Sequence, residues 1–266
     1  MKMKTICIAT LLIFLTGCTS DPPVKEQTDE GKIENSDQEN ENAEPEKKEE
    51  PAQKEASTPE EVIAEIEKQL STDVPIKLPE TLKLDEGYHL TAKTDSDQDS
   101  YQVVIFQTEE VIPINDAKLD QLSDDSILAV LSGQNYESEE AASEQISYQN
   151  FEQIGGESVD LGYSITGYQD AGAGSVFLSW NEGRWAFTSR ARTEDSDILQ
   201  TESKKIVEFL ESNMLPPPKK YGSGKFDTIS EHSRDQILAW QEEQTVYKIE
   251  KAEGALKTLG IAVSIK

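Results

Sequence analysis

The sequence predicts an α+β fold in which a twisted antiparallel sheet carries helices packed on one face. Segments whose apolar residues alternate with polar ones are typical of strands with one solvated face, and Val159, Leu161, Tyr163 and Ile165 form the clearest of them. Segments with apolar residues three and four positions apart predict amphipathic helices. An acidic stretch ahead of all of them predicts a disordered tether.

The N-terminus has the pattern of an export signal. Lys2 and Lys4 precede an apolar run from Thr5 to Leu15. This run is too short to span a bilayer, which takes roughly 20 residues, and it matches the apolar core of a secretory signal. Leu15-Thr16-Gly17-Cys18 resembles the lipobox of bacterial lipoproteins. That resemblance implies removal of a lipoprotein signal peptide over residues 1–17 and attachment of lipid to Cys18. An ordinary secretory signal followed by a chance cysteine is the alternative.

The cysteine usage agrees with a lipoprotein. Cys7 lies in the segment to be removed and Cys18 takes the lipid, so the mature chain has no free thiol. We therefore expect no disulfide, no cysteine nucleophile and no thiolate metal site. The expected location is the extracytoplasmic face of the cell membrane, with the membrane itself as a partner through the lipid.

Residues 18–56 are predicted to form a disordered acidic linker. After Cys18 this segment holds 13 acidic and 5 basic residues and no aromatic one, so it cannot bury enough apolar surface to offset the entropy of ordering. We expect it to act as a spacer between membrane and domain. A specific acidic docking segment is the alternative.

The rest of the chain is acidic as well, with 39 acidic and 18 basic residues from position 57 to 266. Such a surface repels phosphate backbones, so nucleic-acid binding is not expected. Solvation of an exported domain is the preferred explanation of the charge. Loose cation binding or a basic partner remains the alternative.

Residues 57–150 form the N-terminal part of the predicted globular region. A helix should begin at Thr58-Pro59-Glu60-Glu61, because Thr58 can cap it and Glu61 can complete a capping box. Strands are predicted over Tyr88–Thr94, Tyr101–Thr108 and Ser126–Leu131, and a short helix over residues 138–147. Asp95, Asp97 and Asp99 resemble the start of a calcium loop, but Ser100 replaces its glycine, which favours a hairpin turn.

Residues 151–266 form the C-terminal part, with two predicted hairpin-plus-helix units. In the first, strands Ser175–Trp180 and Trp185–Arg190 are joined through Asn181-Glu182-Gly183 and followed by a helix over Ser196–Asn213. In the second, strands Gln236–Glu242 and Thr245–Glu250 precede a final helix. Trp180 and Trp240 have the same place in the two units, and we expect both to be buried beneath the helices.

Two resemblances follow from these segments. The lipobox, the acidic linker, and the patterns LPETLKLDEGYHL and LSWNEGRWAF resemble the uncharacterised lipoproteins of bacilli. More distantly, a strand pair with W-x-E-G followed by a helix is similar to extracytoplasmic sensor domains whose curved sheet resembles lipoprotein carriers. The second resemblance implies a concave sheet able to hold a peptide or an acyl chain.

No catalytic motif, cofactor motif or metal-ligand motif is found in the sequence. The two histidines, His89 and His232, stand outside any recognised pattern. Gly222-Ser223-Gly224-Lys225 lacks the first glycine of a phosphate loop and is predicted to be an ordinary loop.

The candidate ligand-binding residues are Tyr163, Trp180, Trp185 and Trp240, although aromatic residues on strands are more often core. The favoured function is a membrane-anchored, non-enzymatic binding or sensor module that takes a protein, peptide or apolar ligand on the sheet. The alternative is a carboxylate-dependent hydrolase of a cell-wall or surface polymer, which would need two carboxylates about 5 to 10 Å apart in a cleft.

Overall fold

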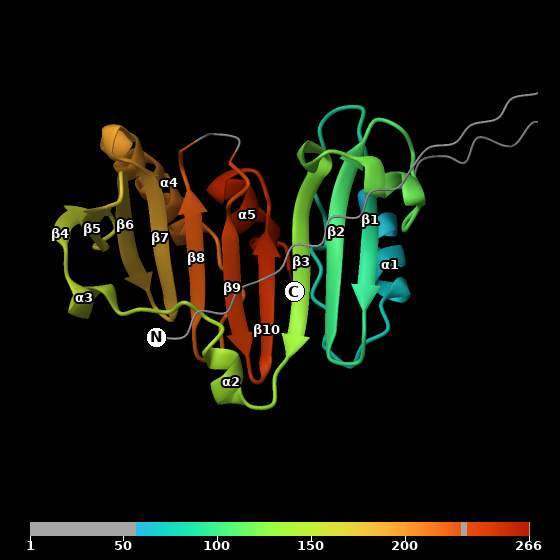
Figure 1. Ribbon diagram of the computed structural model, residues 1–266, viewed down its shortest axis with the longest axis horizontal. Helices are drawn as coiled ribbons and strands as arrows, with labels where there is room; N and C mark the ends of the chain where they lie inside the picture. The colour runs from blue at the N-terminus through green and yellow to red at the C-terminus, as the bar shows by residue number, and fades with distance from the viewer. Residues whose placement is uncertain (1–56, 230–232, 266) are drawn as a thin grey trace, which may run out of the picture. The chain divides into compact units, whose positions relative to one another are not determined.

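Ten strands form one open sheet in the computed structural model, which describes residues 57–229 and 233–265 (Figure 1). The strands are β1 (His89–Ser96), β2 (Ser100–Thr108), β3 (Ile127–Asn135), β4 (Glu157–Asp160), β5 (Thr166–Gly172), β6 (Ser175–Glu182), β7 (Trp185–Arg192), β8 (Gly222–Asp227), β9 (Ile237–Glu242) and β10 (Thr245–Glu250). The helices are α1 (Pro59–Gln69), α2 (Glu139–Ser143), α3 (Phe151–Ile154), α4 (Ser196–Ser212) and α5 (Gly254–Val263), with 3-10 turns η1 (Ala117–Gln121), η2 (Asp124–Ser126) and η3 (Thr193–Asp195). The predicted signal peptide, Cys18 and the predicted linker lie outside the described residues.

The sheet is mixed, not wholly antiparallel as expected. Its strand order is β1-β2-β3-β10-β9-β8-β7-β6-β5-β4, and β7 pairs with β8 in parallel while the other neighbours are antiparallel. A parallel pair needs a crossover connection, and α4 supplies it between β7 and β8. The parallel pairing of β7 with β8 therefore depends on the crossover through α4.

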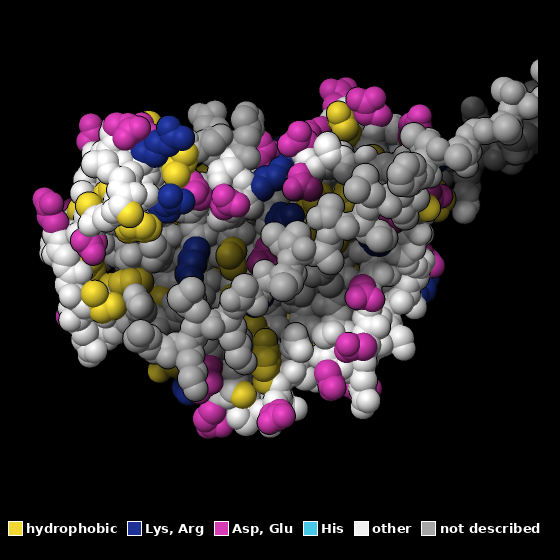
Figure 2. Space-filling view, in the orientation of Figure 1, with side chains coloured by type: hydrophobic (Ala, Val, Ile, Leu, Met, Phe, Trp, Pro, Cys, Tyr) yellow, Lys and Arg dark blue, Asp and Glu magenta, His cyan; other side chains and the backbone are white. Residues whose placement is uncertain are grey.

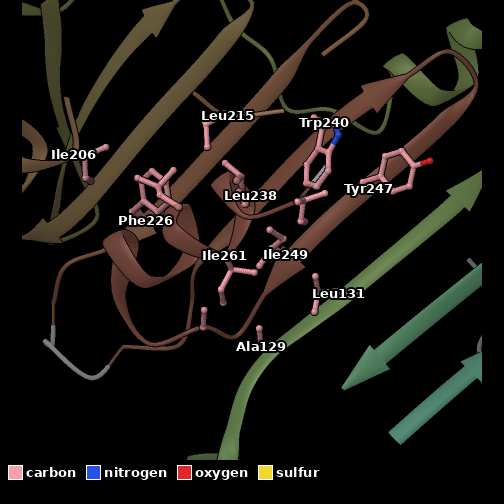
Figure 3. Close-up of a cluster of buried hydrophobic side chains, with 14 of the residues drawn as sticks. Ala129, Leu131, Ile206, Leu215, Phe226, Leu238, Trp240, Tyr247, Ile249 and Ile261 are labelled. Carbon is pink, nitrogen blue, oxygen red and sulfur yellow. The ribbon is translucent and has the colours of Figure 1, made fainter. Parts of the chain in front are cut away.

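The main hydrophobic core lies on the sheet face that α1, α4 and α5 cover. Ile66 of α1, Ile206 of α4 and Leu259 of α5 are buried in one cluster with strand residues such as Leu131 and Leu238. Figure 3 shows part of this cluster, including Ile206 and Ile261 from the helices. The expectation that helices pack on one face holds for these three helices.

Helix α2 departs from that expectation. Ala142 and the nearby Ile146 pack against Ala239 and Val246, which alternate with the core residues of β9 and β10 and so point to the opposite face. Helix α2 therefore covers part of the face that the main core leaves open. It also ends at Ser143, before the predicted residue 147, and β3 runs to Asn135, beyond the predicted Leu131.

The clearest predicted strand, residues 159–165, is instead a hairpin end. Gly162, Tyr163 and Ser164 all have positive φ angles, of 87°, 52° and 67°, and the carboxylate of Asp160 accepts a hydrogen bond from the Gly162 N–H. The alternation of apolar and polar residues that predicted a strand has another cause: Leu161 and Ile165, on either side of the turn, both pack on the core. Two short strands, β4 and β5, stand where one was expected.

Strand β8 includes residues 222–225, which were predicted to be an ordinary loop. In the sheet, Gly222 lies opposite Trp185 and Gly224 opposite Phe187. A Cβ atom at Gly222 would come within 2.5 Å of the Trp185 ring, and one at Gly224 within 2.6 Å of the Phe187 ring. The glycines thus leave room for aromatic rings of β7 to lie across β8.

Several local predictions are confirmed. The capping box at Thr58 and Glu61 is formed, with N–H to oxygen distances of 3.0 and 3.3 Å. Asp97 closes the β1–β2 hairpin by accepting from the Asp99 N–H and the Ser100 hydroxyl. The β6–β7 hairpin has two residues in its turn, Gly183 and Arg184, not three, since Glu182 pairs with Trp185.

Across the described ranges, no helix combines the length and apolar character needed to cross a membrane.

Candidate functional site

The three tryptophans proposed as ligand contacts lie in the core. Trp180, Trp185 and Trp240 are 0%, 7% and 1% exposed, on the face covered by α4 and α5. Tyr163 is 59% exposed at the β4–β5 turn. The structure therefore does not bring the four residues together on an open surface, and the predicted burial of Trp180 and Trp240 is confirmed.

The two hairpins repeat one polar contact in detail. The indole N–H of Trp180 donates to Glu182 Oε1 at 2.8 Å, and that of Trp240 donates to Glu242 Oε1 at 3.0 Å. Each hairpin also pairs its tryptophan with an aromatic residue of the second strand, with ring centroids 5.5 Å apart for Phe187 and 5.4 Å apart for Tyr247.

The residue after each tryptophan, Asn181 or Gln241, makes an equivalent contact on the other face of the sheet. The Asn181 side chain donates to the Gln149 carbonyl and accepts from the Phe151 N–H, at the start of α3. The Gln241 side chain donates to the Glu139 carbonyl in α2. Both hairpins thus hold a short helix on the face opposite their tryptophan.

The two glutamates differ in their charged surroundings. The Lys77 ammonium lies 3.2 Å from Glu242 Oε1 and 5.6 Å from the centre of the Tyr247 ring. Glu182 has no ion pair among the described residues. Burial raises the pKa of the Glu182 carboxyl to about 7, with the negative charge of Glu211 acting in the same direction and the Trp180 hydrogen bond opposing both.

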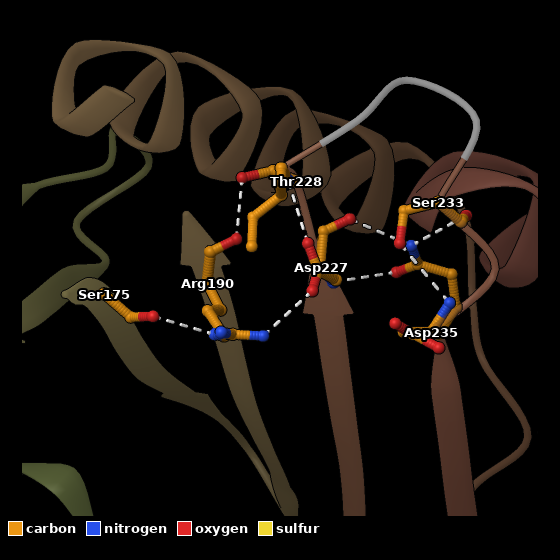
Figure 4. A network of polar contacts seen from close by, with 8 residues as sticks. Ser175, Arg190, Asp227, Thr228, Ser233 and Asp235 are labelled. Atoms are coloured by element: carbon orange, nitrogen blue, oxygen red, sulfur yellow. Dashed lines mark hydrogen bonds and ion pairs between the residues drawn. The ribbon is translucent and has the colours of Figure 1, made fainter. Parts of the chain in front are cut away.

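A polar network closes the upper ends of β7, β8 and β9 (Figure 4). The Arg190 guanidinium donates to Ser175 Oγ at 3.1 Å and to Asp227 Oδ2 at 3.2 Å, and Thr228 bonds back to the Arg190 carbonyl. The buried Gln236 side chain joins the backbone of Asp227 to that of Ser233. The polar groups of this network bond to one another, so we interpret it as a structural link between the ends of these strands.

A hollow lies between α1 and the edge strand β1, and Asn115 holds together the segments that line it. The backbone N–H of Asn115 donates to the Ala92 carbonyl, and its side-chain oxygen accepts from the Thr94 N–H at 2.7 Å. Its amide group donates to Gln69 Oε1, at the end of α1, at 2.8 Å. One asparagine, at a φ of 63°, therefore holds the segment before it along β1 and fixes it to the helix.

We call this hollow the α1 groove, and its volume is about 730 Å³. Its wall of apolar side chains includes Val62 of α1, Leu90 of β1 and the run Val111–Ile114, with Val111 itself 55% exposed. Its polar lining is contributed by Ser57, Glu61, Glu65, Lys68, Gln69 and His89. The groove combines an apolar wall with a charged rim, which is the common character of small-ligand and peptide sites.

The face opposite α1, α4 and α5 is different in character where the structure describes it. Figure 2 shows acidic side chains gathered around its periphery, with a few lysines and arginines nearer its middle. A shallow hollow of about 330 Å³ over β2, β3 and β10 is lined by Asp95, Glu250 and Lys248 together with glutamine and serine side chains. Its charges are mixed, so it lacks the character of a site for a polyanion.

Within the described part of the chain, no three histidine, cysteine, aspartate or glutamate side chains are grouped so that they could hold a metal ion. The chain matches no protein-family model, no curated protein sequence and no solved structure.

The α1 groove was missed in the sequence, although one signal was present. Val111-Ile112-Pro113-Ile114 is a short apolar run directly after a strand, with a proline that prevents regular pairing. This run could have been recognised as an apolar segment that lies at the surface without joining the sheet. Its position against α1 depends on Asn115, whose bonds to residues 21 and 46 positions away have no local signature.

Proposed function

We propose that this protein is a membrane-anchored extracytoplasmic lipoprotein whose domain acts as a non-enzymatic binding module through the α1 groove. The anchor rests on the Leu15–Cys18 motif. The binding site rests on one observation: a hollow of about 730 Å³ beside α1 has an apolar wall that includes the exposed Val111.

The groove favours an elongated, partly apolar ligand. Its wall follows α1 and the start of β1, and a peptide or acyl chain lying there would remove the half-buried Val62 and the exposed Val111 from water. Addition of a strand along β1 is less suitable, because Asn115 already occupies the Ala92 carbonyl and the Thr94 N–H. The ligand would therefore be held by its side chains or its apolar chain.

The carboxylates at the groove favour binding over hydrolysis. Glu61 and Glu65 lie one turn apart on α1, near the separation that a glycoside hydrolase requires. However, Glu61 completes the capping box of α1, and Glu65 pairs with Lys68 at 3.4 Å. Both groups have structural partners, and no observation supports a role for them as a general acid and a nucleophile.

A photo-crosslinking amino acid at position 111 tests the proposal in intact cells. Illumination should give a discrete adduct, and the mass of the attached group would show whether it is a peptide or a lipid. Position 154 is a matched control, since Ile154 is an exposed apolar residue outside the groove residues.

Adducts at position 111 that equal those at position 154 in amount and identity would refute the groove as a binding site. As a second variant, Val111→Asp should place a charge on the apolar wall and reduce ligand capture, whereas Ile154→Asp should not. Both positions are exposed, so neither change should disturb folding.

A further inference from the structure

The repeated tryptophan–glutamate contact includes a lysine in one hairpin, whereas in the other no lysine or arginine of the described residues pairs with the glutamate. We propose that Glu182 is a recognition site for a primary ammonium group, which a bound partner supplies there as Lys77 supplies it to Glu242 within the chain.

The Glu242 site shows what such a complex looks like. The Lys77 ammonium meets a carboxylate oxygen that already accepts from Trp240, and it lies over the ring of Tyr247. The backbone next to that lysine is fixed from both sides, because the Lys77 N–H bonds to the Tyr101 hydroxyl and the Tyr247 hydroxyl donates to the Pro75 carbonyl. The ammonium is thus delivered by an extended segment that crosses the end of the hairpin.

The Glu182 site has a carboxylate and an aromatic residue at the positions equivalent to Glu242 and Tyr247. Trp180 donates to Glu182, and Phe187 stands at the position of Tyr247 in the hairpin register. The charged group that acts on Glu182 most is Glu211, a second carboxylate on α4. A partly buried negative charge with a like charge beside it is unfavourable, and a bound cation would offset it.

The geometry favours an ammonium over a guanidinium. In the Glu242 site one oxygen, Oε1, meets both the indole N–H and the Lys77 ammonium, which suits a compact donor, whereas a guanidinium bonds best to both oxygens of one carboxylate. A lysine side chain of a partner protein and a free polyamine both carry the required group. The proposal concerns the β6–β7 hairpin and does not depend on a ligand in the α1 groove.

The indole N–H groups provide a direct test, because the chain has three tryptophans and the indole of Trp180 donates to Glu182. The full chain, labelled with ¹⁵N-tryptophan and assigned with single Trp→Phe variants, would be titrated at about pH 8. The probes are Nα-acetyl-lysine methylamide, spermidine and Nα-acetyl-arginine methylamide, with sodium chloride at equal ionic strength as the reference. The Trp180 indole signal should shift saturably with the two ammonium probes, and the Trp240 signal should not.

Two further results are expected if Glu182 is the recognition site. Glu182→Gln, which keeps an acceptor for the indole, should weaken ammonium binding by about tenfold, the loss of one charge-assisted bond. Lowering the pH to about 5.5 should weaken it by a similar factor or more, because the carboxylate is then protonated. The stronger of the two ammonium probes indicates whether a lysine side chain or a polyamine is the better ligand.

The proposal is overturned if the Trp180 shift is the same in sodium chloride, or if Glu182→Gln binds the ammonium probes as tightly as the parent chain. Equal binding of the arginine probe would refute the preference for an ammonium. A negative result here would leave crosslinking at position 111 unaffected, so failure of this site and failure of the α1 groove are distinguishable.

Discussion

Trp180 and Trp240 occupy the same position in two separate hairpins, and each donates its indole N–H to the glutamate two residues further along the chain. A buried indole needs such a partner, since an unpaired N–H in the core is costly. Because residues two positions apart on a strand point to the same side, the glutamate at the hairpin end can reach the indole. The W-x-E pattern therefore places a large aromatic ring in the core with its polar atom satisfied.

Truncation of either tryptophan to alanine should destabilise the domain by about 3 to 5 kcal/mol, because both rings are buried. That is a large share of the roughly 5 to 15 kcal/mol that stabilises an ordinary domain. Denaturant unfolding of both variants measures the loss. Met214→Ala is the control, since this side chain is 85% exposed. A loss within about 0.5 kcal/mol for either tryptophan would contradict its place in the core.

Gly133→Ala should destabilise the domain by about 1 to 3 kcal/mol through overpacking. Gly133 on β3 lies between Tyr101 on β2 and Tyr247 on β10, and a Cβ atom there would come within 2.5 Å of the Tyr101 ring. Gly172→Ala is the matched control, because a Cβ atom at that strand position would have no neighbour within 4 Å. Equal unfolding free energies for the two variants would show that the tyrosine rings do not need the glycine.

The same packing explains why strand β8 was not predicted. Glycines at positions 222 and 224 indicate a loop when only local propensity is considered, since glycine weakens a strand. These glycines leave room for the rings of Trp185 and Phe187. The two aromatic residues lie about 37 residues earlier in the chain and become neighbours only through the parallel pairing of β7 with β8. Tertiary contacts of this kind leave no pattern within the segment.

Local patterns were sufficient where a segment determines its own structure. The capping box at Thr58, the helix from Ser196 and the β9–β10 hairpin each depend on residues a few positions apart, and they were predicted closely. The alternation around Tyr163 misled because a tight turn can place apolar residues on the core from both sides. The candidate site was missed because it lies between elements.

Replacement of Cys18 by serine should abolish lipid attachment if the Leu15–Cys18 motif is a lipobox. Cells grown with a fatty-acid analogue should label the parent chain and not the variant. Cys7→Ser is the control, because Cys7 belongs to the segment that is expected to be removed, so labelling should persist. Label that remains in Cys18→Ser would refute the anchor without bearing on the folded domain.

Neutralising the two equivalent glutamates should change stability in opposite directions. The folded-state pKa of Glu182 is raised from 4.5 to about 7, so the native state holds its proton more tightly than the unfolded chain. The protonated Glu182 carboxyl therefore contributes to the free energy of unfolding fully below about pH 4.5, and this contribution is lost as the pH rises through about 7. Glu182→Gln should stabilise the domain at about pH 8 by about 1 kcal/mol, after allowance for solvent screening, and should have little effect at about pH 5.

Glu242→Gln should instead destabilise the domain at about pH 8, by about 1 kcal/mol or more. It removes the carboxylate that pairs with Lys77, whose side chain is only 19% exposed, and so leaves a half-buried ammonium without its partner. Urea unfolding of both variants and the parent at the two pH values gives the comparison. Changes of the same sign at about pH 8 would show that the two hairpins do not differ in their charge balance, because both glutamates would then be either paired or unpaired.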